Sequence, residues 1–190
     1  MVHTDYFQRM SDQYPIRDQN DTYFLTWTTI EWIDIFTRKE YRIILAENLN
    51  FCIENKGLIV NAWVIMSNHM HLIARAMEGY RMSDILRDYK KFTSKAIATA
   101  IQELPESRSR WLVDLMAFNA RKTGRADEFK MWQDGSHAMD CFSASFTKQK
   151  LDYIHNNPVR AMWVDRPEDY VFSSARDYCG IKGLVNVELI

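Results

Sequence analysis

Hydrophobic positions along this chain change their period several times, and each change marks a predicted element. Residues 23–29 are rich in β-branched and aromatic side chains, which is typical of a strand. After Thr37, which we expect to cap a helix, apolar residues recur at helical spacing until Gly57. Residues 58–65 and 69–74 then predict two strands joined by a tight turn, because both are short, apolar and rich in β-formers.

Helical periods dominate the second half of the chain. Ser83 is expected to cap a long helix, and Ser145 is expected to cap the last one. Pro158 disfavours helical backbone at Asn157, so we expect the last helix to end there. The predicted ranges are helices 83–103, 107–121 and 146–157, short strands 129–133 and 138–142, and an irregular segment 159–190.

This order of strands and helices predicts an α+β fold of the ferredoxin-like kind. Such a fold has an antiparallel sheet with helices packed on one face, which leaves the other face free to carry a site. We expect one catalytic domain over residues 22–180, between an N-terminal tail, 1–21, and a C-terminal tail, 181–190. Within the domain, residues 103–130 could be an insertion.

Composition narrows the class of protein. Of the 190 residues, 47% are hydrophobic and 26% are charged, as in a globular protein. The net charge of −1 disfavours nucleic-acid binding, although a balanced total can hide a basic face. Three cysteines without a Cys-x-x-Cys pair suggest a reducing, intracellular setting. Neither a signal peptide nor a membrane span is indicated, so we expect a cytoplasmic protein.

The second strand of the predicted hairpin carries His69 and His71. Side chains alternate across a strand, so both rings point to one face, where they could hold one metal ion between them. The alternative is two half-buried strand residues with hydrogen-bonded rings, and a lone His-x-His favours that alternative. No third ligand lies nearby in sequence, so it would have to come from another element.

The last predicted helix supplies the best partners for the two histidines. Tyr153 and Asn157 are four residues apart and share a helix face. Taken singly, Tyr153 could be an edge-of-core tyrosine, and Asn157 could only end the helix before proline. His155 faces away from Tyr153, and we expect structural roles for it and for His137.

One predicted helix has a basic face, and a further arginine follows the last helix. These side chains could contact phosphates, with a solvated surface as an equal alternative. The candidates are Arg87, Lys90, Lys91, Lys95 and Arg160.

Four motifs occur in a fixed order and become specific together. They resemble the single-tyrosine HUH transposases, in particular the REP-associated tyrosine transposases, over about residues 23–180. The motifs are Asn-Ala-Trp-Val-Ile-Met-Ser-Asn-His-Met-His-Leu-Ile (61–73), Met-Trp-Gln-Asp-Gly-Ser-His (131–137), Lys-Leu-Asp-Tyr-Ile-His-Asn-Asn-Pro-Val-Arg-Ala (150–161) and Phe-Ser-Ser-Ala-Arg-Asp-Tyr (172–178).

The resemblance implies a DNA nuclease and strand transferase acting on single-stranded, hairpin-containing DNA, as a monomer or homodimer. It implies His69 and His71 as paired metal ligands, Asn157 as the third ligand, and Mg²⁺ or Mn²⁺ as the ion. Tyr153 would be the nucleophile, forming a 5′-phosphotyrosine. Two alternatives stay open: a domesticated hairpin-binding protein that does not cut, and a metal hydrolase without a covalent step.

Overall fold

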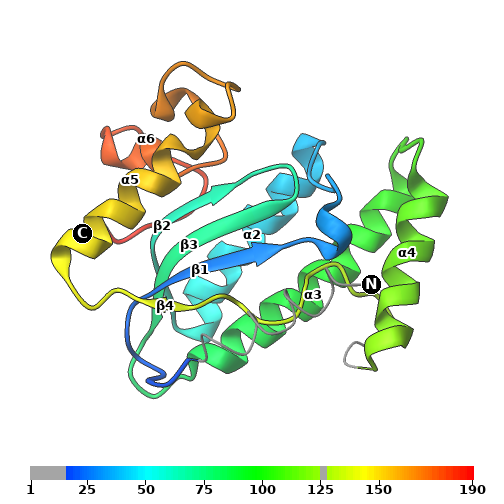
Figure 1. Cartoon of the computed structure of the whole chain (residues 1–190), viewed down its shortest axis with the longest axis horizontal. Helices are drawn as coiled ribbons and strands as arrows, with labels where there is room; N and C mark the ends of the chain where they lie inside the picture. Colours follow the sequence, from blue (N-terminus) through cyan, green and yellow to red (C-terminus); the bar gives the residue numbers. More distant parts are fainter. Residues whose placement is uncertain (1–15, 125–127) are drawn as a thin grey trace, which may run out of the picture.

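The computed structural model describes residues 16–124 and 128–190, in which four antiparallel strands form one sheet (Figure 1). Across the sheet the strands are β2 (Leu58–Ile65), β3 (His69–Ala76), β1 (Tyr23–Thr28) and β4 (Met139–Asp140). The predicted α+β class with an antiparallel sheet is confirmed. Most of the predicted N-terminal tail, 1–21, lies outside the described residues.

The register of the sheet puts two sets of side chains on opposite faces. β1 pairs with β3 so that Thr26 lies opposite His71 and Thr28 lies opposite His69. Directly opposed residues of an antiparallel pair share a face, so these four residues line the same side. The alternate residues, among them Trp27, point to the other side and into the larger core.

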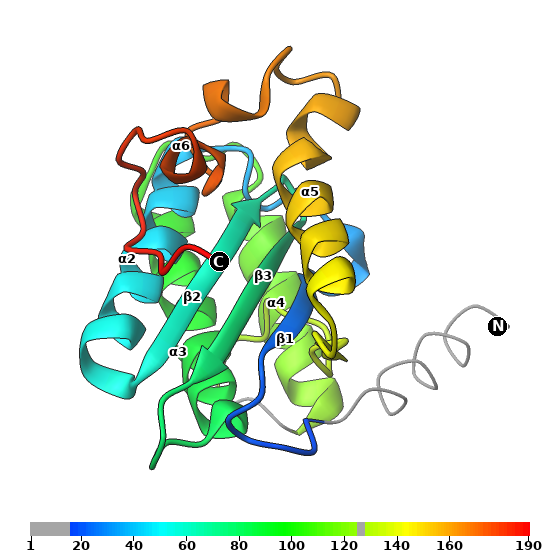
Figure 2. The same ribbon diagram turned by 90° about the vertical axis from the view of Figure 1, so that its left-hand side faces the viewer.

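Helices cover the sheet on both sides, as Figure 2 shows. The larger core lies between the sheet and α2 and α3, and α4 packs against α3. A smaller core lies on the opposite face, where Ile154 of α5 is fully buried with Ala62, Val64 and Ile73. The prediction that helices pack on one face of the sheet is therefore right for α2 and α3, but α5 lies across the other face. The helices are α2 (Lys39–Lys56), α3 (Met82–Glu103), α4 (Ser109–Thr123) and α5 (Ala144–Arg160).

The predicted ends of α5 were wrong at both termini. Ser143, not Ser145, is the N-cap, and its side chain accepts a hydrogen bond from the backbone N of Phe146 at 3.2 Å. At the other end the helix continues through Pro158 to Arg160. A proline removes only one backbone N–H from the helix. Pro158 and Ile154 are both buried, so packing stabilises the last turn although proline disfavours helical backbone at Asn157.

Other local predictions also need correction. The N-caps of α2 and α3 are Arg38 and Arg81 rather than Thr37 and Ser83, and neither arginine side chain caps its helix. Residues 129–133 are not a strand, since only Trp132 bridges to Thr29. Of the predicted strand 138–142, two residues pair, as β4. Here isolated backbone hydrogen bonds to β1 replace a regular ladder, such as those from Thr26 N to Ser136 O at 3.0 Å and from Gln133 N to Thr28 O at 2.8 Å.

The C-terminal segment covers the exposed edge of β2. The backbone N of Ile65 donates to Phe172 O at 3.0 Å, and the backbone N of Glu188 donates to Val60 O at 2.9 Å. The predicted tail, 181–190, therefore runs along the sheet and buries Val185. Pairing of this kind blocks an edge that could otherwise recruit another chain. The short helices are η1 (Ile30–Trp32), η2 (Pro167–Asp169) and α6 (Ala175–Tyr178).

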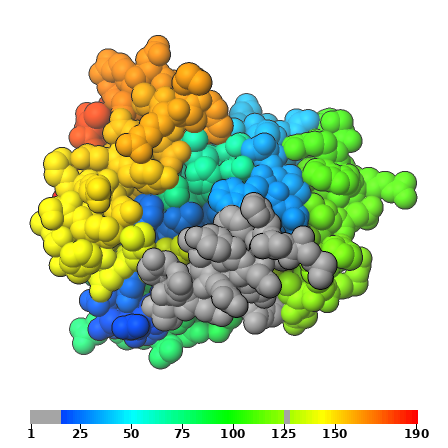
Figure 3. Space-filling view, viewed as in Figure 1, coloured from blue at the N-terminus to red at the C-terminus, as the bar shows by residue number. Residues whose placement is uncertain are grey.

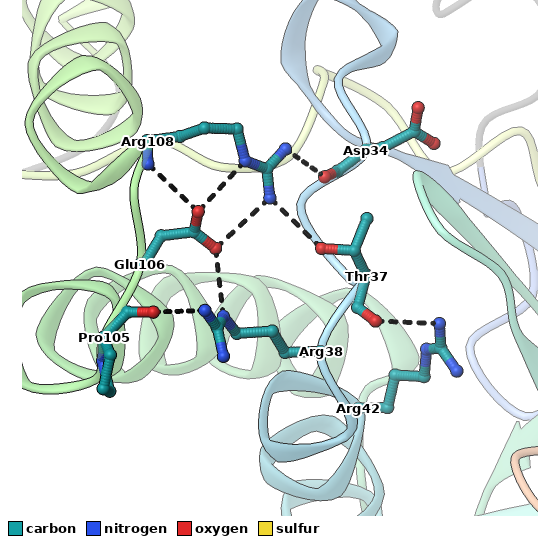
Figure 4. A network of polar contacts seen from close by, with 7 residues as sticks. All are labelled: Asp34, Thr37, Arg38, Arg42, Pro105, Glu106 and Arg108. Atoms are coloured by element: carbon teal, nitrogen blue, oxygen red, sulfur yellow. Dashed lines mark hydrogen bonds and ion pairs between the residues drawn. The ribbon is translucent and has the colours of Figure 1, made fainter.

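The α3–α4 connection, part of the segment considered as an insertion, is tied to the start of α2 (Figure 4). The carboxylate of Glu106 is 4% exposed and accepts from Arg108 Nε at 3.1 Å and from Arg38 Nε at 3.3 Å. Arg108 also donates to Asp34 O at 2.9 Å and to Thr37 Oγ1 at 3.1 Å. Hydrogen bonds from Arg108 are the main reason that the pKa of Glu106 falls to about 2.

We expect Glu106→Gln to lower the free energy of unfolding by about 2 kcal/mol at pH 7, because charge-assisted hydrogen bonds are lost. The folded-state pKa lies below the ordinary value of 4.5, so this stability is present above pH 4.5 and is lost as the pH falls toward 2. Urea unfolding across this range measures it. Asp114→Asn is the control: its exposed pair with Arg110 is 3.9 Å long and should contribute under about 0.5 kcal/mol. A deficit independent of pH would contradict the assignment.

No helix within the described residues combines the length and the apolar character needed to cross a bilayer.

Candidate active site

His69 and His71 stand at the start of β3, on the sheet face that α5 crosses. Their ring centroids are 5.0 Å apart. His71 is 4% exposed, whereas His69 is half-buried at the turn that joins β2 to β3. The structure therefore brings the two rings together on one face, as the alternation along the strand predicts.

Each histidine has a hydrogen-bond partner on Nδ1. His69 Nδ1 donates to Asn68 Oδ1 at 2.7 Å, because an amide oxygen can only accept, and this leaves the lone pair on Nε2. His71 Nδ1 lies 2.9 Å from Thr26 Oγ1, its cross-strand neighbour. His71 Nε2 is buried and has no hydrogen-bond partner among the described residues. Both Nε2 atoms are thus left for a ligand.

Asn68 is itself held in place by η1. Its Nδ2 donates to the carbonyl of Trp32 at 3.1 Å. Trp32 and Glu31 both have positive φ angles, 56° and 51°, which are uncommon for residues with side chains. Strained backbone of this kind gathers at functional sites, and here it positions the carbonyl that orients Asn68 and, through it, His69.

Electrostatics keep both rings neutral at pH 7. Burial is the main cause that lowers the pKa of His71 to about 3, and the nearby His69 and Lys150 contribute to this value. Burial also lowers the pKa of His69. Neutral imidazole is the form that coordinates a metal ion, so burial prepares both side chains for that role.

Tyr153 reaches this pair from α5. Its half-buried ring meets His71 edge-on, with centroids 5.2 Å apart, and meets Phe24 edge-on at 6.1 Å. Phe24 in turn stacks on His71 at 5.3 Å. The neighbouring Ile154 is fully buried against the sheet and fixes the rotation of the helix. The rings of Tyr153 and Phe24 therefore cover one side of His71.

Asn157 lies one turn beyond Tyr153 on α5 and is half-buried. Its side chain forms no hydrogen bond within residues 16–124 and 128–190, so its amide oxygen is available. No group of three His, Cys, Asp or Glu side chains in the described part could hold a metal ion. Two imidazoles, one with a buried nitrogen that has no partner among the described residues, and an amide one turn beyond Tyr153 are of the types that fit a divalent ion with mixed N and O ligands.

The predicted phosphate contacts separate into two groups. Arg160 lies at the site, with its guanidinium carbon 5.4 Å from the centre of the Tyr153 ring. Arg87, Lys90, Lys91 and Lys95 lie on α3, which packs against the opposite face of the sheet and is not brought to the histidines. In the view of Figure 3, α5 (yellow to orange) and the green region that contains α4 lie at opposite sides of the visible face.

Arg87 and Lys90 of that α3 group contact other groups of the protein. Arg87 donates to Asp84 at 2.8 Å and to Asp88 at 2.9 Å. Lys90 donates to the carbonyl of Gly135 and lies 5.5 Å from the Trp27 ring. Burial lowers the pKa of Lys90 to about 7, so it is not part of a solvated basic face. DNA contact by α3 stays a prediction, and Lys91 and Lys95 are the side chains exposed for it.

His155 has the structural surroundings expected of it. Its Nε2 lies 2.9 Å from Ser174 Oγ, and its ring meets Tyr178 at 4.9 Å. Burial lowers its pKa to about 4. His155 therefore joins α5 to the C-terminal segment on the side away from Tyr153. His137 is a partly buried turn residue with φ of 37°.

The segment from β1 to α4 identifies the protein family. The model of the family described as "Transposase IS200 like" matches residues 19–130, more than half of the chain. The chain belongs to the IS200-like transposase family. The matched residues include His69 and His71. They also include 103–130, the segment considered above as a possible insertion. The helix α5, with Tyr153, lies beyond the matched residues.

A solved structure extends the likeness to the whole fold of this transposase. It is the structure of a REP-associated tyrosine transposase bound to a REP hairpin, with a TM-score of 0.61 and 21% identity, covering 90% of this chain and 87% of that chain. The resemblance inferred from the four motifs is thereby confirmed. A comparison with curated proteins gives no match.

Proposed function

We propose that this transposase is a metal-dependent tyrosine nuclease and strand transferase that cuts single-stranded, hairpin-containing DNA. The observation that carries the proposal is the ring of Tyr153 against His71, whose buried Nε2 has no hydrogen-bond partner in the described part of the chain. A hydroxyl that can form a covalent phosphodiester and a vacant imidazole nitrogen thus share one small site. Membership of the transposase family supports DNA as the substrate.

Each side chain has a defined part in the reaction. Tyr153 Oη attacks the scissile phosphorus and loses its proton, forming a 5′-phosphotyrosine, while the 3′-oxygen leaves and takes a proton to become a free hydroxyl. Mg²⁺ or Mn²⁺ bound by His69, His71 and Asn157 would polarise the phosphate and stabilise its developing charge. The new ester conserves bond energy, so a 3′-hydroxyl can reverse the step and join strands without ATP.

The solved structure of a related transposase supports hairpin-containing DNA as the substrate. The REP-associated transposase that shares this fold is bound to a REP hairpin, and the fold is covered almost from end to end. The net charge of −1 leaves little general attraction for duplex DNA. A single strand presented beside a hairpin would enter the site between α5 and β3, where the local side chains are cationic and aromatic.

A pair of end-labelled hairpin oligonucleotides tests the proposal. With Mn²⁺ or Mg²⁺, the 3′-labelled strand should move with the protein on a denaturing gel, whereas the 5′-labelled strand should be released as a shorter free fragment. EDTA should abolish both products. Binding without cleavage across a broad hairpin library would favour the domesticated binder, and attachment of the 5′-labelled strand would contradict the 5′-phosphotyrosine.

Thr26→Val tests the role of the second contact to His71. Valine keeps the branched shape but cannot bond Nδ1, so we expect Mn²⁺ affinity to fall about tenfold or more while the strand stays intact. Titration followed by electron paramagnetic resonance measures it. Thr28→Val is the matched control, since Thr28 shares the strand and the face but bonds neither histidine through its side chain. Equal affinity in Thr26→Val and the wild type would contradict the role.

A further inference from the structure

Two cations flank Tyr153 along α5. Lys150 lies three residues before it and Arg160 seven residues after it, so all three share a side of the helix. Lys150 Nζ is 4.7 Å from the centre of the Phe24 ring, the ring that stacks on His71 and meets Tyr153. The Arg160 guanidinium lies over Tyr153 itself, at 5.4 Å.

Neither cation has an acidic partner in the part of the chain that the structure describes. Some cations elsewhere in the fold do have such a partner. Lys148, two residues before Lys150, lies 3.5 Å from Asp152, and Arg75 lies 3.0 Å from Glu188. In a chain with as many acids as bases, two unpaired cations beside a nucleophile indicate a site for an anion.

The surroundings of Lys150 hold its ammonium in place without neutralising it. Its Nζ lies between two aromatic rings, Phe24 at 4.7 Å and Phe146 at 5.1 Å. Aromatic faces attract a cation but leave its net charge and its hydrogen-bond donors available.

We propose that Lys150 binds the scissile phosphate and offsets the negative charge that this phosphate gains as Tyr153 attacks. The inference rests on the proposed function and adds a substrate contact to it. A phosphodiester carries one negative charge before the attack and two in the transition state, so a fixed ammonium stabilises the latter more. The same contact would hold the phosphotyrosine until a 3′-hydroxyl arrives. Arg160, whose guanidinium lies over the Tyr153 ring, would bind the neighbouring phosphate.

The test compares Lys150→Gln with Lys148→Gln, a matched change on the same helix whose native lysine is paired with Asp152. On ordinary hairpin DNA we expect the cleavage rate of Lys150→Gln to fall about 100-fold. Lys148→Gln should cleave at the rate of the wild type, and Lys150→Arg, which keeps the charge, should recover most of that rate. On DNA with an uncharged methylphosphonate at the cleaved position, Lys150→Gln and the wild type should cleave at similar rates. Equal loss on both substrates, or equal loss in both glutamine variants, would overturn the inference.

A binding measurement separates this inference from the proposed function. In a Tyr153→Phe background, where no covalent step occurs, Lys150→Gln should reduce the salt dependence of DNA binding by about one phosphate contact, and Lys148→Gln should not. Lys150→Met, which keeps the apolar stem, guards against a folding defect and should behave as Lys150→Gln does. If the wild type cuts no DNA but this difference in slope is present, the proposed cleavage fails and the phosphate contact stands. An unchanged slope would overturn the contact.

Discussion

Tyr153→Phe is expected to reduce strand cleavage by roughly 10⁴-fold or more and to remove the covalent protein–DNA band. Phenylalanine keeps the ring, and therefore keeps the edge contacts with His71 at 5.2 Å and with Phe24 at 6.1 Å. Only the hydroxyl that would attack phosphorus is lost. Hairpin binding, measured by fluorescence anisotropy, should stay within about twofold of the wild type, since one uncharged group is removed.

A second tyrosine provides the control for this change. Tyr178 donates to Asn61 O at 3.0 Å on the far side of α5, so Tyr178→Phe loses a hydrogen bond and a little stability but no reacting group. It should cleave at the rate of the wild type. Cleavage that persists in Tyr153→Phe would instead indicate a metal hydrolase without a covalent step.

His71→Gln is expected to slow cleavage by roughly 10³-fold, because a ligand that helps to stabilise several kcal/mol of transition-state charge is removed. Glutamine has a similar volume but cannot supply the imidazole Nε2 that is buried without a partner. Calorimetric titration with Mn²⁺ should show weaker binding, and excess metal should restore part of the rate. Both readouts are needed, since loss of the ring also removes its stacking on Phe24 at 5.3 Å.

His155→Gln is the control for the histidine change. This ring is also buried and hydrogen-bonded, but its partner is Ser174 and it faces away from the site. It should unfold at a lower temperature and yet keep both Mn²⁺ affinity and cleavage. A rate that falls equally in the two variants would show that general destabilisation, rather than loss of a metal ligand, is being measured.

Much of the sheet could be predicted from the chain because its hydrophobic pattern is strong. Residues 58–65 and 69–74 are short, almost continuous apolar runs, which predict buried strands. Side chains alternate along any strand, so the placing of His69 and His71 on one face followed from sequence alone. The position of Tyr153 at the site could not be predicted from the hydrophobic pattern alone. Its helix is amphipathic, and the burial of Ile154 then turns Tyr153 toward β3, but only the motif resemblance linked that helix to the histidines.

The parts that could not be predicted depend on contacts between distant segments. Thr26 is unremarkable in sequence, and its bond to His71 exists because β1 and β3 pair in that register. Lys90 has the spacing of a surface residue, but the loop at 133–135 folds over it and supplies carbonyl partners. The link between Lys150 and the site depends on its contact with Phe24, which lies on β1 and is distant in sequence.

The central claim is that Tyr153 becomes covalently attached to the 5′ end of cleaved DNA. The most direct measurement is to trap the adduct with a hairpin substrate whose released 5′ fragment, which bears the free 3′-hydroxyl, dissociates. The adduct is then digested with protease and nuclease, and the modified peptide is mapped by mass spectrometry. The account predicts a nucleotide phosphate on Tyr153, in the peptide between Lys150 and Arg160. A phosphate on another tyrosine, or cleaved DNA with no modified peptide, would contradict it.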